Sequence, residues 1–331
     1  MFNIDLAIKF GSNEIIIYRK GVGIIAKEPA YLAVVETNGK TKVKAIGKRA
    51  EKMFHSQTDQ VNVYQPIVNS EIVNEKMAVV LISEILADVI QDKFMLSNLS
   101  ALVAVPCALS HDQLLLIKRV LHESGVNKVE FVQNSVCVQT SLDLDPQSHI
   151  MVVDIGKYIT DISVLNEFNF SFGRMYYIGG QDMDKSIATF VLDNHNLHVS
   201  ELTCENIKNE IASLYDRDSN HIEYTGLNDA NKFENKVITA SEVKVALVNV
   251  YDAILKFVGE VFKDISADIS KEVYNTGVVF VGGASCIAGL YEYAKKKLDM
   301  KIIVPEDPAD CVILGAGKLL SHNKEFLKIE I

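Results

Sequence analysis

The sequence predicts an α/β protein built from two related halves. Short β-rich runs alternate with helical periods along 331 residues, a length that suits two domains. A strand–turn–strand pattern opens the chain at residues 4–18, and a similar pattern begins at residue 151. A glycine-bearing turn follows a predicted strand at three places. These observations favour an internal duplication with two interlocked α/β halves.

The bulk composition excludes several classes of protein. A net charge of -10 argues against sequence-independent binding of DNA or RNA, which needs a basic surface. No apolar run approaches the roughly 18 residues needed to span a bilayer, and residues 1–5 do not resemble a signal peptide. The five cysteines are widely spaced, which is typical of reduced thiols. We therefore expect a cytoplasmic protein.

The first half should contain two hairpins followed by alternating helices and strands. Alternating apolar residues predict strands at 4–10 and 14–18, and Asn38-Gly39 favours a tight turn between strands at 31–36 and 42–46. Helical spacing predicts a helix over 76–92, and Ser110 is a good N-cap for another. The remaining elements expected in this half are strands at 101–106 and 129–132 and a helix from about 135.

The second half repeats the pattern. Strands are expected at 151–156, 160–166 and 168–177, with helices at 181–194 and 204–215. Residues 216–236 are polar and are interpreted as loop, and a continuous helix is expected over 241–269. A buried strand at 277–281, a short strand at 301–304 and a helix from about 310 complete the half.

Three glycine-bearing turns are candidate phosphate-binding sites. Small residues after a strand let backbone N–H groups approach a phosphate closely. A single such glycine is more often only a turn, but three in one chain favour a nucleotide cleft between two domains. The turns are Gly11-Ser12-Asn13, Asp154-Ile155-Gly156 and Gly282-Gly283-Ala284.

Asp154 is a candidate metal ligand. It is the acidic residue at the tip of a predicted core strand beside a glycine turn, and a carboxylate there commonly binds Mg²⁺ through water. The alternative is an aspartate that caps a turn.

The run Phe94-Met95-Leu96 is a candidate membrane anchor. Three large apolar residues precede polar Ser97-Asn98 in an expected surface loop, where polar residues are the norm. The alternative is a loop that packs beneath a neighbouring helix.

Motifs along nearly the whole chain resemble the bacterial actin homologue MreB and its MreB-like (Mbl) relatives. They include Tyr18-Arg19-Lys20-Gly21-Val22-Gly23-Ile24, Ala45-Ile46-Gly47-Lys48, Met151-Val152-Val153-Asp154-Ile155-Gly156, Ile178-Gly179-Gly180-Gln181-Asp182-Met183-Asp184, Gly282-Gly283-Ala284, and Glu306-Asp307-Pro308 with Leu314-Gly315-Ala316-Gly317-Lys318. The resemblance implies an actin-like (duplicated ribonuclease-H-like) fold with two domains around a nucleotide cleft. The implied domains are 1–149, with a small subdomain at about 33–65, and 150–331, with a small subdomain at about 181–245.

The family resemblance also implies a cellular role. Such proteins polymerise into filaments at the inner face of the cell membrane and guide cell shape. The implied partners are other copies of the chain, an MreB paralogue, the membrane surface, and cell-wall synthesis or membrane-adaptor proteins. Phe94, Met95 and Leu96 match the apolar loop that attaches some members to the membrane.

The same resemblance implies ATP and Mg²⁺ as ligands. The cofactor-binding positions that it transfers to this chain are Gly11, Ser12, Asn13, Gly156, Lys157, Tyr158, Thr160, Glu205, Lys208, Gly282, Gly283 and Ala284, with Asp154 as a catalytic and metal-binding residue.

Four positions depart from the family pattern at the phosphate end of the site. Lys9 stands where the family has an acidic residue near the metal, and Lys157 and Tyr158 replace two glycines of the second phosphate loop. Asn134 replaces the glutamate that positions the attacking water, and an amide cannot act as a base.

These departures predict weak or absent ATP hydrolysis by a filament subunit. Two alternatives stay open: an active filament ATPase that tolerates the substitutions, and a filament used for motility or cell helicity in a wall-less bacterium. Sugar kinases and Hsp70-type chaperones share the fold class, but the length and the final motifs of the chain favour neither.

Overall fold

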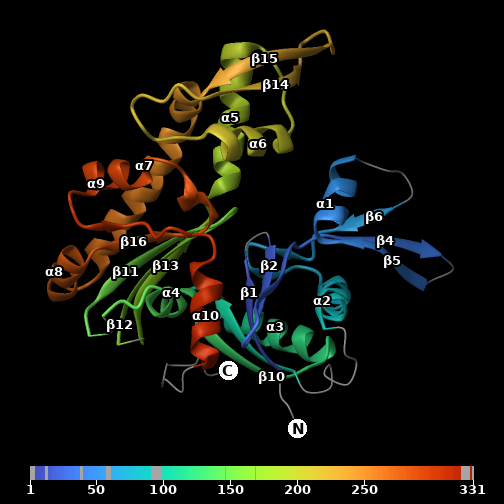
Figure 1. Ribbon diagram of the computed structural model, residues 1–331, viewed down its shortest axis with the longest axis vertical. Helices are drawn as coiled ribbons and strands as arrows, with labels where there is room; N and C mark the ends of the chain where they lie inside the picture. The colour runs from blue at the N-terminus through green and yellow to red at the C-terminus, as the bar shows by residue number, and fades with distance from the viewer. Residues whose placement is uncertain are drawn as a thin grey trace. The chain divides into compact units, whose positions relative to one another are not determined.

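A computed structural model describes residues 4–11, 14–37, 40–56, 61–90, 99–145, 147–167, 169–321 and 329 (Figure 1). The chain divides into two compact units. Unit 1 comprises Met1–Pro146, Leu165–Ser171 and Asp310–Ile331, and unit 2 comprises Gln147–Val164 and Phe172–Ala309. This division differs from the predicted second domain of 150–331, because the residues from Asp310 onward group with unit 1.

Unit 1 is built on a five-stranded sheet with the order β10-β9-β1-β2-β3. Strand β1 runs antiparallel to β2 and parallel to β9, while β2 and β3 are antiparallel and β9 and β10 are parallel. The strands are β1 (Ile4–Phe10), β2 (Glu14–Arg19), β3 (Gly23–Pro29), β9 (Leu99–Val105) and β10 (Val126–Gln133).

Helices α2 (Glu75–Val89) and α3 (His111–Glu123) pack with this sheet. Asn74 caps α2 by accepting the Met77 N–H, and Ser110 caps α3 by accepting the Gln113 N–H, as the sequence predicts for Ser110. Helix α4 (Asn134–Ser141) follows β10 directly. The apolar faces of α2 and α3 and the inner face of the sheet form one continuous core.

A three-stranded sheet of order β5-β4-β6 carries helix α1 (Gly47–Ser56) and has its own small apolar cluster around Tyr31, Ala33, Ala45 and Ala50. The predicted hairpin is present, since β4 and β5 are antiparallel neighbours. The small strands of unit 1 are β4 (Leu32–Thr37), β5 (Lys40–Ile46), β6 (Asn62–Tyr64), β7 (Ile67–Val68) and β8 (Glu71–Ile72).

Unit 2 contains a second five-stranded sheet with the order β13-β12-β11-β16-β17. Strand β11 is parallel to β16, and β16 is parallel to β17. All six residues of β11 are buried, as expected for a central strand covered on both faces. The strands are β11 (Ile150–Ile155), β12 (Thr160–Asn166), β13 (Asn169–Tyr176), β16 (Val278–Val281) and β17 (Ile302–Ile303).

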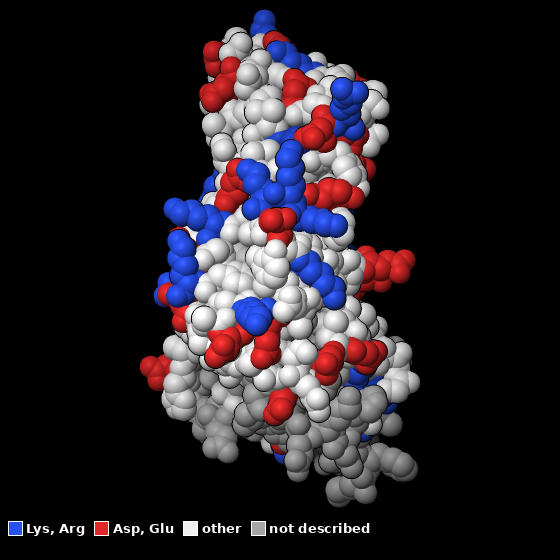
Figure 2. All heavy atoms as spheres, turned by 90° about the vertical axis from the view of Figure 1, so that its left-hand side faces the viewer, with Lys and Arg blue, Asp and Glu red and all other residues white. Residues whose placement is uncertain are grey.

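The helices of unit 2 pack their apolar faces into one core with this sheet. They are α5 (Gly180–His195), α6 (Glu201–Ile211), α7 (Ala240–Asp264), α8 (Ala267–Thr276), the short 3₁₀ helix η2 (Gly283–Cys286) and α9 (Leu290–Leu298). On the face that carries α8 and α9, basic and acidic side chains are interspersed (Figure 2). Surface ion pairs such as Lys297–Asp252, at 2.9 Å, are in keeping with that mixture.

The two large sheets have the same strand order. In each, three strands that are consecutive in the chain lie side by side, and the first of them also borders a pair of parallel strands from later in the unit. The repeated order confirms the predicted duplication and the actin-like α/β fold.

Helix α10 (Cys311–Ser321) belongs to unit 1, where it packs against α4 and strands β1, β2 and β9. Two glycines permit this packing. A Cβ atom on Gly315 would lie 1.8 Å from the Cys137 carbonyl oxygen, and one on Gly317 would lie 2.7 Å from the Tyr18 ring. The Leu314-Gly315-Ala316-Gly317 motif is therefore a close-packing surface.

Two expectations for unit 2 are wrong. Residues 216–236, interpreted as loop, hold strand β14 (His221–Leu227) and the start of β15 (Phe233–Thr239), which form an antiparallel hairpin. The helix expected over 241–269 is broken at Ile265, and Ser266 caps the separate helix α8 by accepting the Ile269 N–H. In unit 1, strand β3 was not predicted.

The predicted anchor Phe94-Met95-Leu96 lies outside the described residues. Within the described ranges, no helix combines the length and the apolar character that crossing a bilayer requires.

Candidate functional site

The turn between β11 and β12 is the best-defined part of the predicted site. The Gly156 N–H donates to the Ile159 carbonyl oxygen at 2.8 Å and closes the turn. Thr160, the first residue of β12, is fully buried, and its hydroxyl donates to the Ile178 carbonyl oxygen at 2.8 Å. The predicted residues Gly156, Lys157, Tyr158 and Thr160 therefore lie on one ordered turn.

This turn is fixed to the N-terminus of α5. The Gly180 N–H donates to the Gly156 carbonyl oxygen at 2.9 Å, and the Gln181 N–H donates to the Lys157 carbonyl oxygen at 2.7 Å. These bonds satisfy two N–H groups that the first turn of a helix otherwise leaves without a partner. Gly179 makes the approach possible, because its Cβ would lie 2.5 Å from the Gly156 carbonyl oxygen.

Asp154 and Gly282 meet at the ends of two neighbouring parallel strands. Asp154 pairs in register with Val281, so Gly282 lies just beyond it. Gly282 has φ +90°, and a Cβ there would lie 2.4 Å from Asp154 Oδ1. Asp154 is 7% exposed. Only glycine fits both the positive φ and the space beside the Asp154 carboxylate.

Helix α7 supports the turn after β16 through a hydrogen bond. The hydroxyl of the fully buried Tyr251 donates to the Ala284 carbonyl oxygen at 2.7 Å, and burial raises the pKa of this phenol. The Gly282 N–H donates to the Pro308 carbonyl oxygen at 2.8 Å. Nothing lies within 4 Å of the position of a Cβ on Gly283, so this residue borders open space.

Lys157 carries its charge from the turn to α6. Its Nζ lies 3.5 Å from Glu205 Oε2 and 5.8 Å from the centroid of the Tyr158 ring. The side chains of Lys157 and Glu205 are 12% and 29% exposed. Two residues assigned to different parts of a nucleotide site thus form an ion pair here.

Lys208, one helical turn beyond Glu205, makes a tighter and more buried pair. Its Nζ lies 2.7 Å from Asp184 Oδ1 and donates to the Gly180 carbonyl oxygen at 3.1 Å. The Asp184 side chain is 1% exposed. Burial raises the pKa of Asp184, and the nearby Lys208 ammonium opposes that increase. The contacts of Lys208 in this structure are structural, and its predicted contact with a cofactor stays a prediction.

In unit 1, the described site residues lie at the ends of β1 and β10. The Gly11 N–H donates to the Glu14 carbonyl oxygen at 2.9 Å and closes the first turn, while Ser12 and Asn13 lie outside the described residues. Lys9 pairs in register with Ala104 of β9. Asn134 is the first residue of α4 and is 6% exposed.

The positive charge of Lys9 acts on a residue of α4. Burial raises the pKa of the Cys137 thiol, and the Lys9 ammonium is the opposing charge. Lys9 therefore acts electrostatically on the fourth residue of α4, the helix that Asn134 starts.

Unit 2 fits part of a nucleotide and a water-bound metal. The close approach at Gly282 and the open space at Gly283 leave backbone free of side chains beside a buried carboxylate, which suits a phosphate or a sugar. Among the described residues, no group of three or more His, Cys, Asp or Glu is arranged to hold a metal. Asp154 would thus hold Mg²⁺ only in the manner usual for this ion, through waters and substrate phosphates.

Sequence reasoning missed Asp184 and Tyr251, which hold the predicted site residues Lys208 and Ala284 in place. Asp184 ends the motif Ile178-Gly179-Gly180-Gln181-Asp182-Met183-Asp184, and its helical spacing places it beside apolar Ile187. An acidic residue on a buried helix face was the available signal. Nothing in the local sequence distinguishes Tyr251 from the apolar residues around it.

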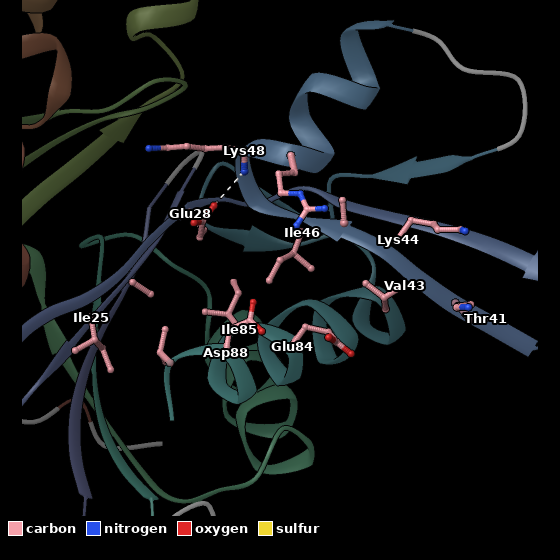
Figure 3. Close-up of a pocket in the computed structure, with 15 residues that line it drawn as sticks. Ile25, Glu28, Thr41, Val43, Lys44, Ile46, Lys48, Glu84, Ile85 and Asp88 are labelled. Carbon is pink, nitrogen blue, oxygen red and sulfur yellow. Dashed lines mark hydrogen bonds between the residues drawn. The ribbon is translucent and has the colours of Figure 1, made fainter. Parts of the chain in front are cut away.

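A separate hollow of about 670 Å³ lies in unit 1 between β3, β5, α1 and α2 (Figure 3). Apolar and charged residues both line it, among them Ile25, Val43, Ile46 and Ile85, the basic residues Lys42, Lys44, Lys48 and Arg49, and the acidic residues Glu28, Glu84 and Asp88. Glu28 accepts the backbone N–H of Lys48 at 3.0 Å. None of the predicted site residues lines this hollow.

Comparison with known proteins agrees with the fold and the motifs. A model of the MreB/Mbl protein family matches residues 3–328. The cell shape-determining protein MreB of Escherichia coli (strain K12) is 26% identical over 326 residues, covering 97% of this chain and 94% of the relative. The cell shape-determining protein Mbl of Bacillus subtilis (strain 168) is 24% identical over 332 residues, covering 99% of each.

Solved structures show the same fold at lower identity. MreB 5 of Spiroplasma citri bound to AMPPNP superposes with a TM-score of 0.90 at 19% identity, covering 97% of both chains. The MamK double helical filament gives a TM-score of 0.81 at 18% identity, covering 98% of this chain and 100% of the other. With the family match spanning nearly the whole chain, the protein belongs to the MreB/Mbl family.

Proposed function

We propose that this protein is a nucleotide-binding cytoskeletal filament subunit that acts in cell shape. The observation that carries the proposal is the meeting of Asp154 and Gly282 at the ends of parallel strands, beside the fixed turn at Gly156. A buried carboxylate next to side-chain-free backbone is the arrangement that a metal–phosphate ligand requires.

The proposed ligand is ATP. Support comes from the relatives of similar fold, whose structures are described as bound to AMPPNP and to ADP. In this chain, Gly156, Thr160, Gly282, Gly283 and Ala284 would supply backbone and hydroxyl contacts, and Glu205 would accept hydrogen bonds from the nucleoside. Mg²⁺, held through water by Asp154, would neutralise phosphate charge.

Hydrolysis should be weak or absent. The Asn134 amide cannot take a proton from water, and Lys9 puts a cation where the family has a metal-binding acid. Loss of a general base alone costs about 10²–10⁴ in rate. The Lys157 ammonium adds positive charge for binding phosphate.

The proposed setting is a filament at the inner face of the cell membrane. The relatives that support it are described as cell shape-determining proteins and, for MamK, as a double helical filament. The partners are further copies of the chain or an MreB paralogue, together with cell-wall synthesis or membrane-adaptor proteins.

Calorimetry with ATP and a phosphate-release assay test the nucleotide proposal. We expect saturable ATP binding and little phosphate release, even over times much longer than ATP takes to dissociate. Steady turnover would instead identify an active ATPase, and absence of binding by the folded protein would contradict the nucleotide site.

Sedimentation tests the filament proposal. The purified chain with ATP, alone or mixed with a paralogue, should pellet at high speed. A chain that stays in the supernatant under all of these conditions is not a filament subunit.

The proposed membrane contact is Phe94-Met95-Leu96. Replacing all three with serine should abolish co-pelleting with liposomes while the unfolding midpoint in urea stays unchanged. Persistent binding by the triple variant would place the membrane contact elsewhere.

A further inference from the structure

Lys157 makes an ion pair that a ligand can exchange. At 3.5 Å, its contact with Glu205 is longer than a charge-assisted hydrogen bond, and the Glu205 side chain is 29% exposed. A long contact to a carboxylate that is partly open to water is weaker than a short contact to a fully buried one. The pair therefore breaks at low cost when a better partner arrives.

The backbone that carries Lys157 cannot follow its side chain. The Gly156 and Lys157 carbonyl oxygens accept the Gly180 and Gln181 N–H groups, and the Gly156 N–H closes the turn on Ile159. Gly179 leaves no space for the turn to move closer to α5. A change of partner by Lys157 is thus a rotation of one side chain about a fixed turn.

The neighbouring pair is unsuited to exchange. Lys208 lies 2.7 Å from an Asp184 side chain that is 1% exposed. If Lys208 left this pair, the buried Asp184 carboxylate would have no compensating charge, which is strongly destabilising. Of these two lysine–carboxylate pairs on α6, the one made by Lys157 is the one able to respond to a ligand.

We propose that Lys157 is a nucleotide-responsive switch: its ammonium pairs with Glu205 in the nucleotide-free protein and transfers to the phosphate chain when a nucleotide binds. The transfer frees the Glu205 carboxylate to accept hydrogen bonds from the nucleoside. This inference rests on the proposed nucleotide site and adds to it a residue that distinguishes phosphate-bearing from phosphate-free ligands.

The switch makes opposite demands on two ligands. ATP offers Lys157 a new partner, so the contact between Lys157 and phosphate offsets the loss of the Lys157–Glu205 pair. Adenosine offers no phosphate, so it competes with Lys157 for Glu205 and receives nothing in return. Removing the ammonium should weaken the first ligand and strengthen the second.

The test measures ATP and adenosine affinities by calorimetry for the wild type and Lys157→Met. A hydrogen bond to a charged group is worth about 1.5–3 kcal/mol, so the variant should bind ATP about tenfold more weakly or worse. It should bind adenosine about threefold more tightly, the value of a partly exposed ion pair. In a Glu205→Gln background, Lys157→Met should still weaken ATP but should leave adenosine unchanged.

Lys297→Met is the matched control, because Lys297 also pairs with a carboxylate of unit 2, Asp252 at 2.9 Å, away from the predicted site. It should change neither affinity, and urea midpoints should show that all variants are folded. If Lys157→Met shifts both ligands in the same direction, or leaves adenosine unchanged, the switch is wrong. If the wild type binds neither ligand, the proposed function fails as well.

Discussion

The turns that open the two large sheets have the same backbone hydrogen bond and differ in the charge of a nearby side chain. In unit 1, the Gly11 N–H donates to the carbonyl oxygen three residues on, at 2.9 Å. In unit 2, Gly156 does the same at 2.8 Å. Two residues before each glycine, unit 1 has Lys9 and unit 2 has Asp154.

This comparison separates what the fold requires from what the chemistry requires. Both turns keep the glycine and the backbone hydrogen bond that closes the turn. Two positions before the glycine the charge differs, with Lys9 in unit 1 and Asp154 in unit 2, while the strand order of the two sheets is the same. The charge at this position is therefore not what specifies the strand order.

The largest expected effect concerns the buried pair behind the unit 2 turn. Lys208→Met leaves the Asp184 carboxylate buried without a counter-charge, and should lower the free energy of unfolding at neutral pH by about 3–5 kcal/mol. Urea denaturation measures it.

The control for this variant is Lys244→Met. Lys244 lies at the same 2.7 Å from its partner, but the Asp216 side chain is 86% exposed. The midpoint should stay close to that of the wild type. Equal losses in the two variants would show that burial does not distinguish the pairs.

The second effect tests the meeting of Asp154 and Gly282. Gly282→Ala places a Cβ at φ +90° and 2.4 Å from Asp154 Oδ1, and should cost about 3 kcal/mol from strain and overpacking. Gly283→Ala meets no atom within 4 Å and should change stability by less than about 0.5 kcal/mol. Similar urea midpoints for the two variants would contradict the close approach.

The third effect is a pH dependence. Burial raises the pKa of Asp184 above its usual 3.8, so the native state holds this proton more tightly than the unfolded chain does. The contribution of the group to stability is therefore present below pH 3.8 and is lost as pH rises through the raised pKa.

Asp184→Asn removes this titration, so the stability of the variant relative to the wild type should increase from pH 4 to pH 7. Urea midpoints at the two pH values measure the change. A wild type that gains stability relative to the variant over this range would show that the pKa is lowered instead.

The smallest effect restores the acid in unit 1. Lys9→Asp makes the charges of the two turns alike, and because Lys9 is partly exposed the change in stability should not exceed about 1 kcal/mol. If Lys9 excludes the metal, ATP affinity of the variant should depend on Mg²⁺ more strongly than that of the wild type. Lys20→Asp, also in unit 1, should leave the Mg²⁺ dependence unchanged. An unchanged dependence in Lys9→Asp would remove Lys9 from the site.

The sequence predicted the elements that bury a regular face. Strands β1, β2, β9 and β11 and helix α2 follow a period of two or 3.6, or a continuous apolar run, because each faces a core. The β14–β15 hairpin was missed since half of its residues are exposed, although Ile222 and Tyr224 alternate with polar residues. The break at Ser266 was missed because the apolar period continues through Ile265 and Ile269.

Site residues were predicted through motifs, and their contacts were not. The sequence places Lys157 and Glu205 48 positions apart, and only the packing of α6 beside the turn brings them together. Glycines of the final motif matched the family without revealing that Gly315 and Gly317 admit Cys137 and Tyr18. Long-range pairing depends on tertiary packing, which no local pattern encodes.

The position of α10 has a consequence for biosynthesis. This helix fills a surface of unit 1 formed by α4 and strands β1, β2 and β9, yet the ribosome makes it only after all of unit 2. Until then the nascent first unit leaves that surface uncovered, including Cys137, which is fully buried in the finished structure, and exposed apolar surface of this kind favours association with other chains. Folding of the first unit can thus be completed only after the second unit has been translated.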